Sequence, residues 1–279
     1  MKIIENIEAL RSTLKNEENI AFVPTMGNLH EGHLSLIRIA KKHADFVVVS
    51  IFVNPLQFLP SEDFNQYPRS FNSDCNMLRN LDVDLVFAPN DKILFPVPQE
   101  ILVLLPPVAN KYEGEFRQGF FCGVATIVLK LFNIIQPDIA IFGKKDYQQL
   151  HIIRLMVQQF NFAIKILDGE IVRATDGLAL SSRNQYLNNA QRLEACNLYQ
   201  ALQSIVNEVK NGHSNFSFLE KKATDKLSER DWKVDYISIL DKRTLLPAQA
   251  NDRELVILAA AQIGKTRLID NIEFINEHY

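Results

Sequence analysis

The 279-residue chain is predicted to be an α/β protein with a doubly wound parallel sheet and a second, smaller α+β domain. Up to about residue 175, short apolar runs alternate with helical patterns, as in right-handed βαβ units. Runs such as Phe46–Phe52 (FVVVSIF) are apolar throughout, like strands covered on both faces. After Asp176 the pattern changes to helices followed by strands, which predicts the second domain.

The first domain is expected to consist of strands joined mostly by helices. The expected strands are Ile20–Val23, Phe46–Phe52, Leu85–Ala88, Ile139–Phe142 and Ile164–Leu167. The expected helices begin at about Gly32 and cover about Ser70–Asn80, Cys122–Ile135 and Tyr147–Phe160. Residues 1–19 are interpreted as a charged amphipathic helix rather than a signal peptide, and the Pro-rich residues 94–108 as irregular.

The second domain is expected to begin with a long amphipathic helix, Asn189–Asn211, which Gly212 ends as a C-cap. A helix at about Phe216–Arg230 and strands at Val234–Leu240, Leu255–Ala261 and Thr266–Ile272 are expected to follow. We expect a hinge near Thr175–Gly177, so the predicted domains are residues 1–175 and 176–279.

Composition limits the classes of function. A hydrophobic share of 47% and a charged share of 23% are typical of a soluble globular protein, and no apolar run approaches the ~20 residues of a membrane span. A net charge of −3 argues against nucleic acid or an anionic membrane as partner, because both need a basic face. Three widely spaced cysteines predict reduced thiols in a cytoplasmic protein, not a disulfide framework or zinc site.

The most informative segment is Pro24–Ile37 (PTMGNLHEGHLSLI), where a strand turns into a helix. The N–H groups and partial positive charge of a helix N-terminus favour phosphate. Gly27 and Gly32 let a ligand approach the backbone, and the imidazoles of His30 and His33 can donate to phosphate oxygens. The segment predicts a nucleotide site without a P-loop, although H-x-G-H alone also fits two solvated histidines at a helix start.

Two further polar segments, Asn54–Gln57 (NPLQ) and Gly143–Asp146 (GKKD), also follow predicted strands. All three segments are therefore expected at the carboxyl edge of the sheet, where ligands bind in such folds. Asp146 could cap the next helix. The side-chain amides of Gln57 and Gln149 could each hold a hydroxyl or carboxylate group of a substrate.

Another candidate segment lies in the second domain at Leu178–Leu187 (LALSSRNQYL). Its Ser181–Arg183 tripeptide suits a mobile clamp on polyphosphate, because arginine offers a fixed charge and two parallel donors. By contrast, Ile263–Thr266 (IGKT) only resembles the end of a P-loop, since Ala259 stands where that motif needs glycine. We expect a turn at Lys265–Thr266.

Seven motifs together resemble one known family. In chain order they are PTMGNLHEGH, SIFVNPLQF, QYPR, TIVLKLFNIIQPD, FGKKDYQQL, LALSSRNQYL and TRLIDN, and they extend across nearly the whole sequence. In this combination the chain resembles the pantoate–β-alanine ligase (pantothenate synthetase) family of HIGH-type nucleotidyltransferases. H-x-G-H alone is shared with other adenylyltransferases and class I tRNA synthetases.

The resemblance implies a Rossmann-like domain that binds ATP and pantoate, and a lid domain that begins with a KMSKS-like loop. It implies that D-pantoate attacks ATP, giving pantoyl adenylate and pyrophosphate, and that β-alanine then yields pantothenate and AMP. The implied cofactor is Mg²⁺ with ATP as substrate. The implied assembly is a cytoplasmic homodimer with no nucleic-acid or membrane partner.

The resemblance also implies roles for individual residues. The implied catalytic residues are His30, His33, Lys145 and Arg183, with His33 the favoured proton donor. ATP is expected to contact Met26, Gly27, Asn28, Leu29, His30, Glu31, Gly32, His33, Gly143, Lys144, Lys145, Asp146, Val172, Leu180, Ser181, Ser182 and Arg183. Pantoate is expected at Gln57 and Gln149, β-alanine at Gln57, and Asp74 is a candidate magnesium ligand.

The chain departs from the family pattern at three positions. Lys144 stands where the family has the glutamate of GEKD, and Gln118 and Phe120 replace the proline and histidine of RPGHF. No role of that histidine can be carried over, and Gln118 loosens a segment that proline would stiffen. Lys144 affects nucleotide affinity only if its side chain points inward.

Other functions fit part of the pattern. An adenylyltransferase with a different acceptor would share the ATP motifs. A non-catalytic nucleotide sensor would bind ATP but form no pyrophosphate. A tRNA synthetase is disfavoured, because the sequence shows neither an anticodon-reading domain nor an excess of basic residues.

Overall fold

The structure is a computed structural model that describes residues 1–59, 62 and 64–278. By its internal contacts the chain divides into two compact units. The first comprises Met1–Ala109, Arg117–Lys144 and Gln149–Ile171, and the second comprises Asn110–Phe116, Lys145–Gln148 and Val172–Tyr279.

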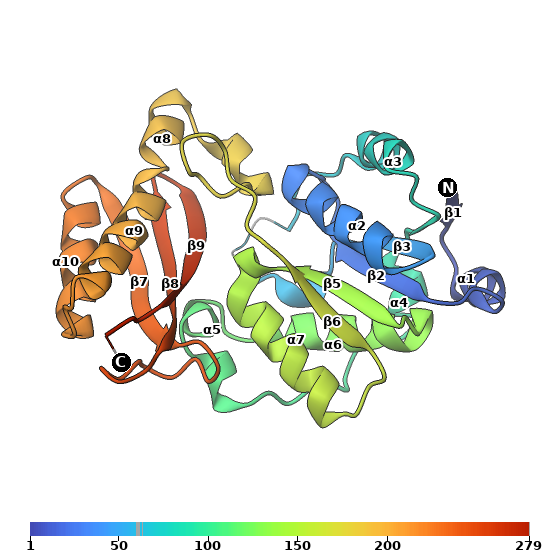
Figure 1. Cartoon of the computed structure of the whole chain (residues 1–279). Coiled ribbons are helices and arrows are strands. Elements are labelled where there is room, and N and C mark those ends of the chain that lie inside the picture. Colours follow the sequence, from blue (N-terminus) through green and yellow to red (C-terminus); the bar gives the residue numbers. More distant parts are fainter. Residues whose placement is uncertain (60–61, 63, 279) are drawn as a thin grey trace. The chain divides into compact units, whose positions relative to one another are not determined.

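A six-stranded parallel sheet forms the centre of the first unit (Figure 1). Its strands are β1 (Lys2–Ile4), β2 (Ile20–Thr25), β3 (Phe46–Ile51), β4 (Leu85–Phe87), β5 (Ile139–Gly143) and β6 (Lys165–Gly169). They lie in the order β1-β4-β3-β2-β5-β6, and each neighbouring pair is parallel. The chain therefore winds outward from β2 in both directions, which confirms the predicted doubly wound sheet.

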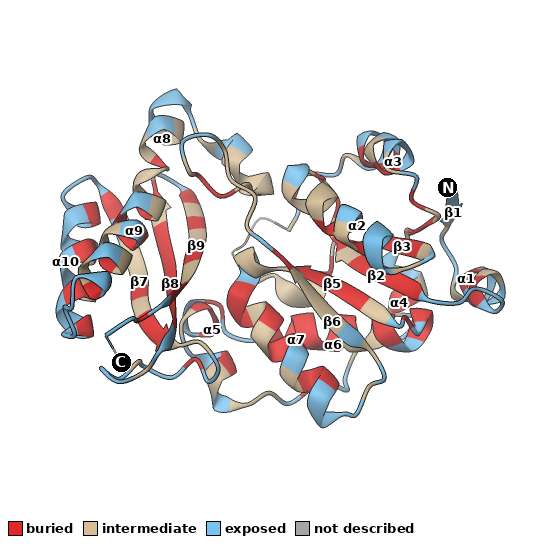
Figure 2. Cartoon of the chain, in the orientation of Figure 1, coloured by how far each residue is buried: buried red, intermediate tan, exposed pale blue. Residues whose placement is uncertain are grey.

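Helices cover both faces of this sheet (Figure 1). They are α1 (Ile7–Leu14), α2 (Glu31–His43), α3 (Phe71–Asn80), α4 (Asp91–Leu94), α6 (Phe120–Ile135) and α7 (Tyr147–Gln159), with 3₁₀ turns η1 (Pro55–Gln57), η2 (Pro107–Asn110) and η3 (Lys144–Asp146). Strand β2 is buried on both sides, because Ile20 and Phe22 pack with α1, α6 and α7, whereas Ala21 and Val23 pack with α2 and α3. Figure 2 shows the buried residues gathered on the strands and the inward helix faces.

The strand order reverses at β2, which has β3 on one side and β5 on the other. At their carboxyl ends, β2, β3 and β5 lead into the three polar segments singled out in the sequence, Pro24–Ile37, Asn54–Gln57 and Gly143–Asp146. This edge is where ligands bind in doubly wound sheets. The fold therefore brings those segments to the expected place.

The second unit contains an antiparallel sheet in the order β7-β8-β9. Its elements are α5 (Glu113–Phe116), η4 (Ser182–Tyr186), α8 (Asn189–Glu194), α9 (Asn197–Lys210), α10 (Phe216–Ser228), β7 (Trp232–Asp241), β8 (Glu254–Ile263) and β9 (Thr266–Ile275). Apolar residues of α9 and α10 pack on the sheet to form the core of this unit. Gly264 and Lys265 form the turn between β8 and β9, one residue earlier than expected, because Thr266 pairs with Ile263 as the first residue of β9.

The prediction of a helix over residues 1–19 was wrong at its start. Lys2–Ile4 form strand β1, because they pair with β4 at the edge of the sheet. Helix α1 begins only after Asn6, whose side chain accepts a hydrogen bond from Ala9 N at 2.8 Å. The cap and the strand pairing move the start of the expected helix to Ile7, and the helix ends at Leu14.

The prediction of one long helix over Asn189–Asn211 was also wrong. The structure has two helices, α8 and α9, with a break at Ala195 and Cys196. Ala195 is fully buried in the core of the second unit, and the Glu194 carboxylate beside it is held by Arg230. Tertiary packing thus overrides a helical pattern that is continuous in the sequence.

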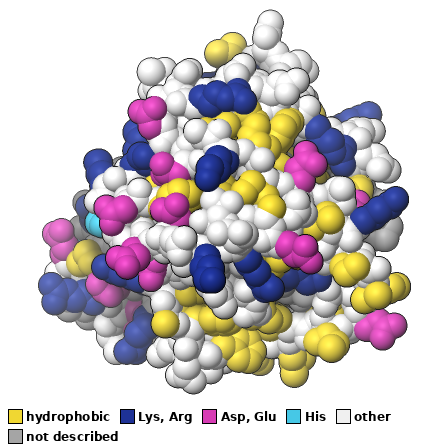
Figure 3. Space-filling model, turned by 90° about the vertical axis from the view of Figure 1, so that its right-hand side faces the viewer, with side chains coloured by type: hydrophobic (Ala, Val, Ile, Leu, Met, Phe, Trp, Pro, Cys, Tyr) yellow, Lys and Arg dark blue, Asp and Glu magenta, His cyan; other side chains and the backbone are white. Residues whose placement is uncertain are grey.

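The surface carries charges of both signs. On the face drawn in Figure 3, acidic and basic side chains are interspersed, in line with the net charge of −3. No helix in the part of the chain described here is long and apolar enough to cross a membrane. The three cysteines are free thiols.

Candidate active site

The two histidines of the first motif cap helix α2 reciprocally. His30 is the N-cap residue, and its Nδ1 accepts a hydrogen bond from Gly32 N at 3.1 Å. Nδ1 of His33 accepts from His30 N at 3.2 Å. A ring nitrogen that accepts carries no proton, so in each neutral imidazole the proton lies on Nε2. The cap therefore makes both rings hydrogen-bond donors through Nε2–H.

The loop that precedes the cap has an unusual backbone path. Gly27 and Asn28 both adopt positive φ angles, +82° and +51°. Glycine takes this conformation without cost and asparagine tolerates it, whereas most residues do not. Gly32 is needed for a different reason, since a Cβ there would lie 2.9 Å from the ring of His30.

Asp74, in the first turn of α3, contacts this loop. Its carboxylate accepts hydrogen bonds from Asn28 N and Leu29 N, each at 2.9 Å, and from Ser70 Oγ at 3.1 Å. The residue is 1% exposed. In the described residues no group of three or more His, Cys, Asp or Glu is arranged to hold a metal ion. The observed contacts of Asp74 are thus with the backbone of the loop and with Ser70.

Gln57 lies at the end of η1, directly beyond β3. Its Oε1 accepts from Asn54 Nδ2 at 3.0 Å, and its Nε2 contacts Met26 Sδ at 3.1 Å. Asn54 is 1% exposed, and the same Nδ2 also donates to the carbonyl of Gly123 on α6 at 3.2 Å. The orientation of the Gln57 amide is therefore set by a buried neighbour.

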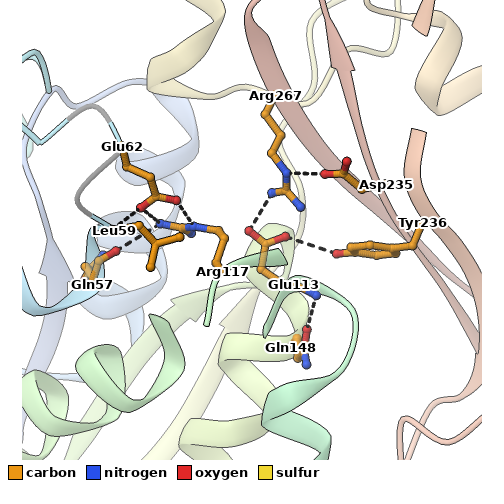
Figure 4. Close-up of polar contacts among 9 residues, drawn as sticks. All are labelled: Gln57, Leu59, Glu62, Glu113, Arg117, Gln148, Asp235, Tyr236 and Arg267. Atoms are coloured by element: carbon orange, nitrogen blue, oxygen red, sulfur yellow. Dashed lines mark hydrogen bonds and ion pairs between the residues drawn. The ribbon is translucent and has the colours of Figure 1, made fainter. Parts of the chain in front are cut away.

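Arg117 contacts both Glu62 and the backbone of Gln57 (Figure 4). Arg117 forms a two-pronged ion pair with Glu62, with Nε–Oε1 at 2.5 Å and Nη2–Oε2 at 2.9 Å, and it donates to the Gln57 carbonyl at 3.1 Å. Its guanidinium also stacks 3.6 Å from the ring centroid of Phe120. The aromatic ring that replaces the family histidine thus packs on this arginine.

The segment after β5 divides between the two units. In the first unit, the Lys144 side chain pairs with Glu170 and lies 3.9 Å from Asp168. In the second unit, the carbonyl of Lys145 accepts from Asn271 Nδ2 at 3.0 Å. Lys144 is therefore engaged by acidic residues at the end of β6, while Lys145 is fixed through its backbone.

Gln148 and Gln149 differ in their surroundings. Gln148 is 4% exposed, accepts from Glu113 N at 3.1 Å and donates to Lys111 O at 2.9 Å. It therefore holds the Asn110–Phe116 segment in place within the second unit. Gln149, the predicted pantoate residue, is half-buried one position further along α7.

The predicted KMSKS-like loop, Leu180–Arg183, has an anchored base. Leu180 N donates to Val172 O at 2.9 Å, and Ser181 Oγ accepts from Arg183 N at 3.3 Å. Arg173 fixes the base, because it binds both carboxylate oxygens of Asp270 at 2.6 and 2.8 Å. Its guanidinium also lies 3.7 Å from the ring centroid of Tyr199. Thr175–Gly177, where a hinge is expected, forms a tight turn in which Gly177 N donates to Ala174 O.

A partly buried polar cluster also lies within the second unit (Figure 4). Arg267 bridges Glu113 at 2.8 Å and Asp235 at 2.7 Å, and Tyr236 donates its hydroxyl to Glu113 at 3.4 Å. Burial raises the pKa of Tyr236 well above its ordinary value, and the Glu113 carboxylate adds to the rise. The cluster joins α5 to β7 and β9.

Comparison with known proteins decides the family. The model of the pantoate–β-alanine ligase family matches residues 2–273. A pantothenate synthetase of Nitrosospira multiformis is 56% identical over 273 residues, which are 98% of each chain.

The chain belongs to the pantoate–β-alanine ligase family.

Solved structures of this ligase family share the fold. A pantothenate synthetase of Thermus thermophilus is 39% identical, with a TM-score of 0.93 over 98% of this chain and 99% of that one. A Francisella tularensis pantoate–β-alanine ligase, complexed with β-γ ATP and β-alanine, is 36% identical, with a TM-score of 0.79 over 99% and 98%.

Several residues that organise this ligase were missed by sequence reasoning. The motif TRLIDN is one of the seven that resemble the family. Only the structure shows that its Asp270 binds Arg173 and its Asn271 binds the Lys145 carbonyl. Asn54 belongs to the NPLQ segment, but its pattern does not indicate that Asn54 orients Gln57. The ion pair between Arg117 and Glu62 joins residues 55 positions apart, and no local spacing reveals it.

Proposed function

We propose that this ligase condenses D-pantoate with β-alanine at the expense of ATP, forming pantothenate, AMP and pyrophosphate through pantoyl adenylate. The family match over residues 2–273 carries the proposal. It is supported by the retention of both motif histidines, Lys145 and Arg183 at the family positions.

In the first step, a pantoate carboxylate oxygen attacks the α-phosphorus of ATP, and the bond to the pyrophosphate leaving group breaks. Negative charge grows on the phosphoryl oxygens, so donors that are already oriented lower the barrier. The Nε2–H groups of His30 and His33 are such donors, because the cap fixes their tautomers. We assign to His33 the hydrogen bond that its Nε2–H donates to the leaving pyrophosphate, and fixed positive charge to Lys145 and Arg183.

In the second step, the amine of β-alanine attacks the acyl carbon of the adenylate, and the carbon–oxygen bond to AMP breaks. As the amide forms, the amine loses a proton to the departing AMP phosphate or to water. A mixed anhydride hydrolyses readily, so a lid that excludes water would protect it. We propose that residues 176–279 act as this lid and that Leu180–Arg183 contact ATP as they close.

The remaining assignments follow the family pattern. We propose that ATP contacts Met26–His33, Gly143–Asp146, Val172 and Leu180–Arg183. We assign pantoate to Gln57 and Gln149, and β-alanine to Gln57. The contacts of Gln57 with Asn54 and Met26 support a preset amide, which lowers the cost of ordering it on binding.

We propose that Mg²⁺ enters with ATP, on its phosphates. The carboxylate of Asp74, the sequence-based candidate ligand, already accepts three hydrogen bonds and is 1% exposed. These surroundings do not fit a metal ligand, and the proposed steps require no metal at Asp74.

We propose that the ligase acts as a cytoplasmic homodimer. An apolar segment supports self-association, since Val97, Ile101 and Leu104 are 70%, 85% and 97% exposed. Charged substitution of both Ile101 and Leu104 should shift the protein from dimer to monomer in analytical ultracentrifugation. An unchanged sedimentation profile would show that Ile101 and Leu104 do not form the dimer interface.

The deciding experiment is a product assay with ATP, Mg²⁺ and D-pantoate, with and without β-alanine. Pyrophosphate should appear with pantoate, and pantothenate and AMP only when β-alanine is added. The variant His33→Asn retains an acceptor near the Nδ1 position but lacks the Nε2–H donor, and should lose most activity while folded. His43→Asn, at the exposed end of the same helix, is the matched control.

Two outcomes would replace the proposal. Adenylate formation with another carboxylate but not with pantoate would point to a different acceptor. ATP binding without pyrophosphate release for any carboxylate would point to a nucleotide sensor.

A further inference from the structure

We propose that Asp74 is a positioning residue for nucleotide binding, which sets the backbone path of Gly27–Leu29 and thereby places His30 and His33. The role of those histidines rests on the proposed function. The placement of the loop by Asp74 rests on contacts within the first unit alone.

The loop needs an external support. Gly27 and Asn28 both have left-handed backbone conformations, and for asparagine that conformation is less favourable than the right-handed one. Such a conformation persists only where surrounding contacts hold it. A support must therefore reach the backbone of these residues.

Asp74 supplies that support. Two consecutive backbone N–H groups, of Asn28 and Leu29, point at its two carboxylate oxygens, each at 2.9 Å. Bonds from an amide to a charged carboxylate are among the stronger hydrogen bonds in proteins, and burial strengthens them further. Packing leaves little space, since a Cβ on Gly27 would lie 3.1 Å from Oδ2 of Asp74.

The support reaches the histidines through one peptide bond. Leu29, whose N–H Asp74 holds, directly precedes His30, the N-cap of α2. His30 and His33 are joined by the reciprocal cap, so they shift together if the loop shifts. Ser70 steadies the carboxylate from the other side with its hydroxyl at 3.1 Å.

The competing interpretation makes Asp74 a metal ligand. A ligand to Mg²⁺ must present a carboxylate oxygen to the ion, whereas both oxygens here face backbone donors. The two roles differ in one measurable respect. A positioning residue affects ATP binding with or without metal, whereas a metal ligand affects it only when metal is present.

The test uses Asp74→Asn, which keeps the shape of the side chain but leaves one acceptor oxygen for the two backbone N–H groups. Ser70→Ala is a milder variant. The matched control is Asp84→Asn, because Asp84 also accepts a backbone hydrogen bond, from Val47 N at 2.9 Å, at the opposite end of the sheet. Hydrogen exchange of peptides covering residues 26–34 reports the loop. Calorimetry reports ATP affinity in EDTA and in Mg²⁺, and steady-state kinetics report the Mg²⁺ concentration at half-maximal rate.

Asp74→Asn should speed exchange in residues 26–34 and weaken ATP binding by on the order of tenfold or more in EDTA and in Mg²⁺ alike. Ser70→Ala should act in the same direction by a few-fold, which keeps the test informative if Asp74→Asn does not fold. Half-saturation by Mg²⁺ should not change, and Asp84→Asn should leave ATP affinity unchanged.

If residues 26–34 of Asp74→Asn exchanged hydrogen at the wild-type rate, the proposal would be overturned. Wild-type ATP affinity in EDTA combined with a shifted Mg²⁺ requirement would also overturn it, because that result would make Asp74 a metal ligand. If the wild-type protein forms no pantothenate, the proposed function fails, while the exchange measurement still decides the role of Asp74.

Discussion

Replacing Gly123 by alanine tests whether the close approach of α6 to η1 sets the position of Gln57. A Cβ on Gly123 would press into the carbonyl group of Leu56, far inside the 3.0 Å limit of real Cβ contacts. It would also lie 3.0 Å from the backbone N of Gln57. Both obstacles are backbone atoms, so the turn itself must retreat by roughly 1 Å to restore ordinary contact.

The expected loss of activity exceeds the expected loss of stability. Overpacking costs about 1–3 kcal/mol, and replacing glycine by alanine within a helix returns about 1 kcal/mol, so a net destabilisation of about 0–2 kcal/mol is expected. The Gln57 amide, however, would lose its 3.0 Å contact with Asn54. A misplacement of about 1 Å at a substrate-holding group can cost on the order of 100-fold in rate.

The assay compares kcat/KM for pantoate and for β-alanine with the thermal midpoint and the KM for ATP. Gly169→Ala is the matched control, because its Cβ would meet the side-chain ends of Leu36 and Ile39, which can rotate away. Gly123→Ala should lose pantoate efficiency about 100-fold and keep its affinity for ATP. If the folded variant kept pantoate kinetics within about twofold of wild type, the approach of α6 to η1 would not control the placement of Gln57.

Three other predictions concern side chains that hold each unit together. Arg117→Lys keeps the charge but loses the two-pronged contact, so urea unfolding should show a loss of about 1–3 kcal/mol together with a raised KM for pantoate. The hydrogen bond from Arg230 lowers the pKa of Glu194, so this carboxylate adds stability above its unfolded pKa of about 4.3 and loses it as the pH falls through the folded pKa. The gap in thermal midpoint between wild type and Glu194→Gln should accordingly be present at neutral pH and close in acid, and a gap independent of pH would contradict the pairing. Asp270→Asn leaves the charge of Arg173 without its carboxylate, so chemical unfolding should show a loss of about 3 kcal/mol, and a change under about 0.5 kcal/mol would argue against a buried pair.

Local pattern was sufficient for much of this fold. Strands β2, β3 and β5 are short continuous apolar runs, and the structure has them within two residues of the expected bounds. Strand β1 was not predicted, because three residues are too few to show the alternation of apolar and polar residues that is typical of a strand. Lys2–Ile4 become a strand only by pairing with Leu85–Phe87, some 80 positions further on.

The candidate site also has a part that local sequence predicts and a part that it does not. The H-x-G-H motif is local, so sequence alone identified the helix start and its two histidines. The residues that hold the site are not local. Arg117 meets Glu62, and Arg173 meets Asp270, through contacts that only the folded chain creates. The resemblance indicates Asp74 only as a candidate magnesium ligand, because the sequence does not show that backbone N–H groups surround its carboxylate.

The reciprocal cap makes the two histidines a single thermodynamic unit. Removing the ring of His33 takes a partner from the backbone of His30, and removing the ring of His30 takes a partner from Gly32. Each single replacement thus removes a proposed ligand contact, one capping hydrogen bond and the contact between the two rings, whose centroids lie 4.1 Å apart, whereas the double replacement loses the ring contact only once. Alanine scanning would overstate the chemistry of either residue. Only a double-mutant cycle separates what the imidazoles do for the substrate from what they do for each other.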